Sequence, residues 1–149
     1  MTNLSVTDRA PDFELVDGAG ETHRLSDYRG QVVVLAFYPL DFSPVCTNEH
    51  ACFVNDLPRF NGANAVVLGV SVDSVWAHKA FAKHMGIDYP LLADFHPKGA
   101  MSEKFGLYYA DKGITHRATV VIDEEGKVAS VYHYDIPQQR NNDEILSAL

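Results

Sequence analysis

The sequence predicts an α/β sandwich, a mixed central β-sheet flanked by helices. Two continuous runs of β-branched and apolar residues, 31–39 and 64–73, are typical of strands buried on both faces, and each is followed by a segment with helical features. Later in the chain, the strand-like segments 116–123 and 127–134 flank the turn sequence EEG and predict a hairpin. Strands that alternate with helices and then form a hairpin produce a mixed sheet.

The first long helix is predicted to begin after Ser43, because serine is a favourable N-cap residue. Pro44 suits the first helical position, where its missing N–H would have no partner in any case. Pro58 is expected to kink or end this helix, since proline removes a hydrogen bond and clashes with the preceding turn.

The second helix is predicted over 74–86, with Ser74 as its cap and Gly86 as its stop. Trp76 and Phe81 are interpreted as core residues of this helix. The C-terminal helix, 142–149, is expected to be capped by Asn142 or Asp143. The remaining expected elements are shorter: a strand at 13–16, an extended segment at 89–94 and a helix within 98–106.

Length and composition fit one globular domain, residues 1–149, with 46% hydrophobic and 21% charged residues. The net charge is −8, and no run of basic residues is present, so neither a nucleic acid nor an anionic membrane surface is expected as a partner. The longest apolar run is far shorter than the ~20 residues that span a bilayer. The N-terminal segment lacks a secretory pattern, so a cytoplasmic location is expected.

The two cysteines, Cys46 and Cys52, lie close together, and three explanations compete: a disulfide, a metal site or a reactive thiol. In the predicted helix, Cys46 occupies the first turn, just beyond the carboxyl end of a central strand. Free backbone N–H groups and the helix dipole favour the thiolate there, and the thiolate is the nucleophile. From position alone, an inert buried thiol is an equal alternative.

Cys52 follows six residues later and faces away from Cys46, about 9 Å along the helix axis. A disulfide between them would require the helix to unwind, because it needs Cα atoms within roughly 7 Å. A metal site formed by Cys46, His50 and Cys52 is not favoured, since the spacing matches no familiar zinc pattern and no fourth ligand is evident.

The stretch FYPLDFSPVCTNE resembles the peroxiredoxin signature, in which a proline, a threonine or serine and a cysteine recur at fixed spacing. The matching residues are Pro39, Ser43 and Cys46, with Glu49 at the usual acidic position. The segments APDFELVDGAGETHRL, VVLGVSVDS and YPLLAD also resemble that family, as does HRATVVIDEEGKV, which carries Arg117. The sequence of these segments is most similar to that of the alkyl hydroperoxide reductase E group, and next to that of the related bacterioferritin comigratory protein group.

The resemblance implies a thioredoxin-like fold and thiol-dependent reduction of hydrogen peroxide and organic hydroperoxides through a cysteine sulfenic acid, as an antioxidant defence. It implies that Cys46 is the attacking thiol and that Arg117 and Ser43 stabilise the leaving oxygen. Glu49 would orient Arg117, and Pro39 would shield the site from water. Serine replaces the usual threonine at position 43, so looser positioning of this hydroxyl is expected. No metal or organic cofactor is implied.

The resemblance also implies an external thiol reductant: thioredoxin, a glutaredoxin-like protein or a low-molecular-weight thiol. Cys52 is either the resolving cysteine or a packed hydrophobe; relatives with a partner on this helix usually carry it five positions after the first cysteine, and here it is six. Relatives often form homodimers near the active-site loop. The alternative outside enzymes is a metal-binding or copper-delivery protein on the same scaffold. A thioredoxin-type oxidoreductase would need a Cys-x-x-Cys pair, which is absent.

Overall fold

The central sheet has five strands in the order β5-β4-β3-β8-β9. The structure is a computed structural model that describes residues 2–149. Three neighbouring strands are parallel: β3 (Val32–Phe37), β4 (Ala65–Ser71) and β5 (Leu91–Ala93). The other two form an antiparallel hairpin, β8 (Ala118–Ile122) and β9 (Val128–His133), and β8 is antiparallel to β3. The predicted mixed sheet is confirmed.

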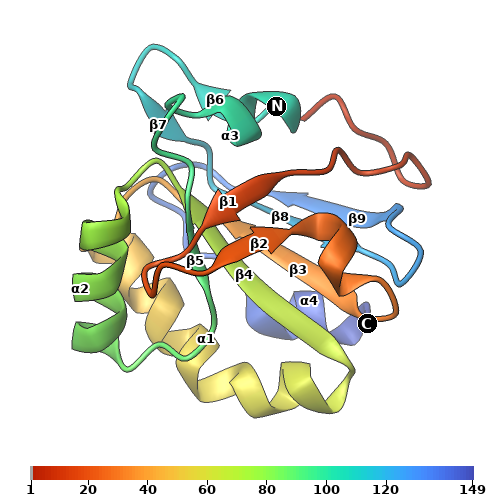
Figure 1. The fold of residues 1–149 in the computed structure, drawn as a ribbon. Helices are drawn as coiled ribbons and strands as arrows, with labels where there is room; N and C mark the ends of the chain where they lie inside the picture. Colours follow the sequence, from red (N-terminus) through yellow and green to blue (C-terminus); the bar gives the residue numbers. More distant parts are fainter. Residues whose placement is uncertain (1) are drawn as a thin grey trace.

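Helices and short strands cover both faces of this sheet (Figure 1). One face is covered by three helices: α1 (Pro44–Gly62), α2 (Val75–Met85) and α4 (Asn142–Ser147). The other face is covered by β1 (Glu14–Val16), β2 (Thr22–Arg24), the 3-10 helix η1 (Leu25–Tyr28) and α3 (Ala100–Lys104). A small hairpin that the sequence analysis did not predict follows α3 and consists of β6 (Tyr108–Tyr109) and β7 (Ile114–Thr115).

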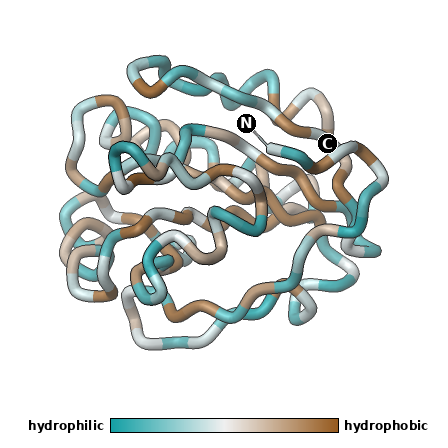
Figure 2. Tube along the Cα trace, turned by 90° about the horizontal axis from the view of Figure 1, so that it is seen from above, coloured by the Kyte–Doolittle hydropathy of each residue, from teal (hydrophilic) through white to brown (hydrophobic). Residues whose placement is uncertain are grey.

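β3 is the centre of both layers of the core, because its side chains alternate between the two faces. Figure 2 shows hydrophobic segments running through the interior and hydrophilic segments mostly along the outer turns. The side chains on the α3 face are Val33, Leu35 and Phe37. Those on the α1 face are Val34, Ala36 and Tyr38. The strand is therefore buried on both faces, as predicted from its unbroken apolar run.

Helix α1 does not end at Pro58 but continues to Gly62, so the alternative that this proline ends the helix was wrong. Proline costs the helix one hydrogen bond, to the carbonyl group four residues earlier. Phe60 lies beyond it and is fully buried, with its ring centroid 5.7 Å from that of Phe53. Burial of this aromatic ring stabilises the last turn by roughly 1.5–3 kcal/mol, which offsets the lost bond.

Helix α2 has the predicted caps: Ser74 accepts a hydrogen bond from the Ala77 N–H, and Gly86 adopts a left-handed conformation. Trp76, however, is 77% exposed and is not a core residue. The buried face of α2 carries His78 and Phe81, and Trp76 lies on the opposite side of the helix. The cap of α4 was also mispredicted, since it is Asn141, whose side chain accepts the Asp143 and Glu144 N–H groups.

The longest helix, α1, has 19 residues and carries many polar side chains, and α2 has 11 residues. Within residues 2–149, we find no helix with the length and apolar character needed to cross a membrane.

Candidate active site

The sheet register explains why Arg117 lies beside Cys46 although 71 positions separate them. Phe37, the last residue of β3, pairs with Ala118, the first residue of β8. Arg117 precedes that pair, so it lies at the carboxyl end of β3. Cys46 lies at the same end, because a short loop joins β3 to α1 and the cysteine occupies the first turn of that helix. The topology thus brings the predicted thiol and the predicted cation together.

The Cys46 thiol and the Arg117 guanidinium are in direct contact in the interior. Cys46 is fully buried, and Arg117 is 2% exposed. The Arg117 Nη2 group donates to Cys46 Sγ over 3.4 Å. The same guanidinium donates from Nε and Nη2 to the Ile136 carbonyl oxygen, at 3.0 and 2.8 Å. Arg117 is therefore held in place before any substrate arrives.

Glu49 lies between two buried guanidinium groups, those of Arg117 and Arg140. Its Oε1 accepts from Arg117 Nη1. Its Oε2 accepts from the backbone N–H and from Nε of Arg140, at 2.7 and 3.1 Å. The predicted contact between Glu49 and Arg117 is thus present. Glu49 lies one turn after Cys46, so it also links the start of α1 to these two arginines.

Arg140 is the residue of this cluster that sequence reasoning missed. It donates to the carbonyl oxygens of Phe37 and Ala118, at 2.6 and 3.0 Å, and to the Thr119 hydroxyl at 2.7 Å. It therefore connects the ends of β3 and β8 to Glu49. Its sequence context, a polar stretch before the last helix, carries no sign of burial, because only the fold places it in the interior.

The buried charged side chains around Cys46 do not sum to zero. The Glu49 carboxylate supplies one negative charge, whereas Arg117 and Arg140 supply two positive charges. Burial of an unpaired charge is unfavourable. The cluster therefore presents a net positive charge to the Cys46 sulfur, which contacts the Arg117 guanidinium.

Pro39 and Ser43 lie in the loop between β3 and α1, as predicted. Pro39 is buried. Ser43 is the N-cap residue of α1, but its side chain makes no capping hydrogen bond. Its Oγ donates instead to the Leu40 carbonyl oxygen over 3.0 Å. The predicted N-cap position is correct, whereas the expected side-chain cap is not formed.

Comparison with known proteins agrees with this geometry. Residues 6–131, most of the chain, match the AhpC/TSA family. Peroxiredoxin-2 of Cricetulus griseus is 41% identical over 154 residues, which cover 97% of this chain and 77% of that protein. This chain belongs to the AhpC/TSA family of peroxiredoxins. Peroxiredoxins are thiol-dependent peroxidases, and the predicted enzyme class is confirmed.

Two further relatives support the same family. The mitochondrial thioredoxin-dependent peroxide reductase of Drosophila melanogaster is 38% identical over 156 residues, covering 98% of this chain and 66% of that protein. The crystal structure of peroxidoxin BcpB from Mycobacterium tuberculosis superposes with a TM-score of 0.87 at 32% identity, covering 98% of this chain and 96% of that one. The predicted thioredoxin-like peroxiredoxin fold is confirmed.

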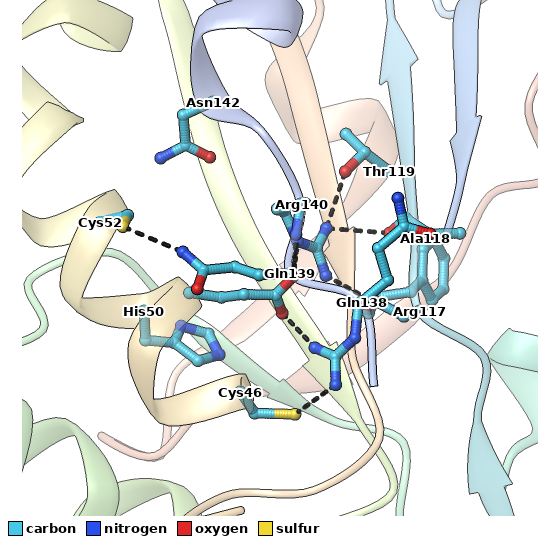
Figure 3. A network of polar contacts seen from close by, with 12 residues as sticks. Cys46, His50, Cys52, Arg117, Ala118, Thr119, Gln138, Gln139, Arg140 and Asn142 are labelled. Carbon is cyan, nitrogen blue, oxygen red and sulfur yellow. Dashed lines mark hydrogen bonds and ion pairs between the residues drawn. The ribbon is translucent and has the colours of Figure 1, made fainter. Parts of the chain in front are cut away.

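The second cysteine of this peroxiredoxin has a different environment from the first. Cys52 is partly exposed, and both cysteines are free thiols. Its Sγ accepts a hydrogen bond from Gln139 Nε2 at 3.4 Å, as Figure 3 shows. It lines a polar surface cavity of about 340 Å³ together with Asp56 and the segment 139–143. Helix α1 is intact between the two cysteines.

His50 is a buried, uncharged residue of the peroxiredoxin core rather than a metal ligand beside the cysteines. Its Nδ1 lies 2.5 Å from the Tyr89 hydroxyl. Burial lowers the pKa of His50 well below 6.5, and the nearby positive charges of Arg140 and Arg117 lower it further. Neither cysteine belongs to a cluster of potential metal ligands among residues 2–149. The Cys46–His50–Cys52 metal site is therefore not assembled.

Proposed function

We propose that Cys46 is the nucleophile of the peroxidase reaction. Its thiolate attacks one oxygen of a hydroperoxide, the O–O bond breaks, and the sulfur becomes a sulfenic acid. The departing oxygen leaves as hydroxide or alkoxide and takes up one proton to give water or an alcohol. The observation that carries this proposal is the fully buried Cys46 Sγ in contact with a fixed guanidinium, 3.4 Å from Arg117 Nη2.

Arg117 stabilises the charge that develops as the O–O bond breaks. Donors that are already in place lower the barrier because they need not reorganise during the reaction. Arg117 is held by Ile136 and Glu49, so its Nη2 group is directed at the reacting sulfur in advance. The backbone N–H groups of Val45 and Cys46 supply further donors, since the first turn of a helix leaves them without helical partners.

Ser43, Pro39 and Glu49 have supporting roles in this proposal. The Ser43 hydroxyl turns from the Leu40 carbonyl to the peroxide when the substrate binds, which costs one hydrogen bond. Pro39 is buried beside the reacting loop and helps to exclude water. Glu49 fixes the orientation of Arg117.

The reductant is an external thiol of the thioredoxin type, a class supported by the name of the Drosophila relative, or a glutaredoxin-like protein or small thiol. It condenses with the sulfenic acid to form a disulfide and water, and a second thiol then releases reduced Cys46. Cys52 acts as the first of these thiols only if α1 unwinds, because the intact helix holds the two cysteines apart.

A homodimer in the reducing cytoplasm completes the proposal. Leu40 and Phe42 of the active-site loop are 40% and 52% exposed, and Phe95 nearby is 55% exposed. Leu40 and Phe95 line the same surface cavity of about 440 Å³. A second copy that covers these apolar side chains removes them from water. Light scattering distinguishes dimer from monomer.

Replacement of each cysteine tests the proposed function. Cys46→Ser is expected to abolish peroxide consumption in the presence of a thiol reductant, whereas Cys52→Ser retains the first oxidation step. Peroxide reduction by Cys46→Ser at the wild-type rate would overturn the assignment. Mass spectrometry after one equivalent of peroxide then separates a one-cysteine mechanism from one with a disulfide between residues 46 and 52.

A further inference from the structure

The loop that joins β3 to α1 is anchored by one buried carboxylate, Asp41. Its side chain is 1% exposed. Asp41 Oδ1 accepts from the Tyr38 hydroxyl at 2.5 Å, and its backbone N–H donates to Asp73 Oδ2 at 2.9 Å. The next residue, Phe42, has a φ of 67°, which is unfavourable for an aromatic residue and persists only where the surroundings enforce it. Asp41 thus holds a strained loop immediately before the helix of Cys46.

His78 of α2 contacts the other oxygen of Asp41, and both of its ring nitrogens face acceptors. Nε2 lies 3.0 Å from the Leu92 carbonyl oxygen, which only accepts, so Nε2 carries a proton. Nδ1 lies 2.7 Å from Asp41 Oδ2, so a proton lies between these two atoms as well. A neutral imidazole beside an ionised carboxylate cannot satisfy both contacts. The His78–Asp41 pair therefore holds one proton more than a neutral imidazole and an ionised carboxylate would.

Most of the titratable groups around His78 are acidic. Besides Asp41, the Asp73 carboxylate lies within 4.8 Å of the ring nitrogen. On its other side, His78 lines a cavity whose titratable groups are Asp17, Glu21, Lys79, Asp88 and Tyr89. The remaining titratable neighbours are Tyr38 and His50. Both are uncharged, because burial raises the pKa of Tyr38 and lowers the pKa of His50. Acidic groups thus outnumber the single lysine.

We propose that His78 is a positioning residue of the peroxidase, whose imidazolium holds Asp41 and thereby keeps the active-site loop closed over Cys46. This inference rests on Cys46 as the reacting thiol, as proposed above. His78 is fully buried and does not contact the sulfur, so it acts through the loop.

Loss of this proton releases the loop. Once Nδ1 is deprotonated, its lone pair faces the carboxylate of Asp41 at hydrogen-bond distance, and the contact becomes repulsive. The strain at Phe42 then favours an open loop. The closed loop is therefore favoured while both ring nitrogens of His78 carry a proton, and it is lost when Nδ1 is deprotonated. The opening exposes Cys46 to thiol reagents too large for its buried position and lowers the rate of peroxide reduction.

Two replacements of His78 separate its two hydrogen bonds. His78→Asn leaves an amide N–H near the position of Nδ1 and loses the contact with Leu92, whereas His78→Gln retains the Leu92 contact and loses the one with Asp41. Both remove the ring, so their difference isolates the hold on Asp41. The measurements are the rate of Cys46 oxidation by hydrogen peroxide and the rate of Cys46 modification by a bulky disulfide reagent, both in a Cys52→Ser background across a pH series.

We expect His78→Gln to be oxidised about 10- to 100-fold more slowly than the unmodified His78 protein, since small misplacements cost this much, and to expose Cys46 at every pH. We expect His78→Asn to react at close to the original rate without the decline at high pH. Equal behaviour of the two variants, or a His78→Gln protein as fast and as protected as the parent, would overturn the proposal.

Nitrogen-15 NMR of the histidine rings tests the proton independently of activity, in the same Cys52→Ser protein. We expect both ring nitrogens of His78 to be protonated at neutral pH, and a singly protonated ring would overturn the proposal. The same NMR spectra, recorded for a Cys46→Ser variant, test the loop anchor separately from the assignment of Cys46 as the nucleophile. Intact His78 signals with undiminished peroxidase activity would refute Cys46 as the nucleophile, while leaving the loop anchor in place.

Discussion

Two sulfur atoms on one helix, six residues apart, have opposite surroundings. Cys46 is fully buried and contacts the Arg117 guanidinium. The Glu49 carboxylate links Arg117 to a second guanidinium, that of Arg140. Cys52 is partly exposed and contacts the uncharged amide of Gln139 at the edge of a surface cavity. The same side chain in the same helix thus contacts a buried guanidinium at one position and an uncharged amide at the other.

This difference shows that the fold, rather than the residue type, sets the environment of each thiol. Thiol reactivity depends on the thiolate, which positive charge and a helix N-terminus favour. Cys46 has both, because the residue before β8 and the segment before α4 place arginines at the start of α1. Cys52 lies in the next turns of the helix, beyond the reach of the N-terminal dipole. Mutations that change one environment should therefore leave the other unchanged.

The largest effect is expected from Glu49→Ala. The substitution leaves Arg117 and Arg140 buried without their carboxylate, and removal of one partner from a buried ion pair costs about 3–5 kcal/mol. The free energy of unfolding by urea measures this loss. Asp143→Ala, which lines the same surface cavity as Cys52, is the control and should cost no more than about 1 kcal/mol, because Asp143 and its partner Arg59 are both exposed. Similar losses in both variants would contradict the comparison.

Arg117→Ala should lower the rate of Cys46 oxidation by about 10²–10³-fold, the usual effect of removing one fixed donor to a developing oxyanion. Stopped-flow mixing with hydrogen peroxide measures that rate. Arg59→Ala, which removes an exposed arginine near the Cys52 cavity, should leave it unchanged. An Arg117→Ala enzyme with the wild-type rate would remove this residue from the mechanism.

A smaller effect concerns the pH dependence of stability through His50. Burial lowers its pKa in the folded state, so the unfolded chain binds the proton more readily. The stability it contributes is complete above about pH 6.5 and is lost as the pH falls below that value, by up to roughly 1.4 kcal/mol per pH unit.

Replacement of His50 by glutamine should flatten this acid slope, measured by urea unfolding at several pH values. His84→Gln, which replaces an exposed histidine, is the control and should keep the slope. An unchanged slope in the His50 variant would show that this ring is protonated in the folded protein.

The smallest effect is expected from Cys52→Ser. The rate of the first oxidation should equal that of the wild type, and stability should change by only about 0.5 kcal/mol, as for most surface substitutions. A slower first oxidation would show that Cys52 assists Cys46 before the sulfenic acid forms, and would weaken the contrast between the two ends of the helix.

Much of the fold followed from the sequence because it depends on local patterns. The unbroken apolar runs predicted β3 and β4, and Ser74 and Gly86 marked α2. Pro58 and Trp76 were misjudged, because packing against distant residues overrides a local helix breaker and decides which face of a helix is buried.

The predicted site residues Cys46, Glu49 and Arg117 came from a recognisable motif pattern, and the structure places them in contact. Arg140 and the Asp41–His78 pair were missed. Each owes its place to a contact between segments far apart in the chain, which no local spacing reveals. The burial of a charged residue in a polar segment, such as Arg140, cannot be predicted before the sheet register is known.

Trapping of the first oxidation product tests the central claim most directly. Wild-type protein is mixed with one equivalent of hydrogen peroxide in the presence of excess dimedone, which captures sulfenic acids, and its peptides are identified by mass spectrometry. We predict the adduct on the Cys46 peptide, or a disulfide between residues 46 and 52 where capture is slower than resolution. An adduct on Cys52 with Cys46 still reduced would contradict the account.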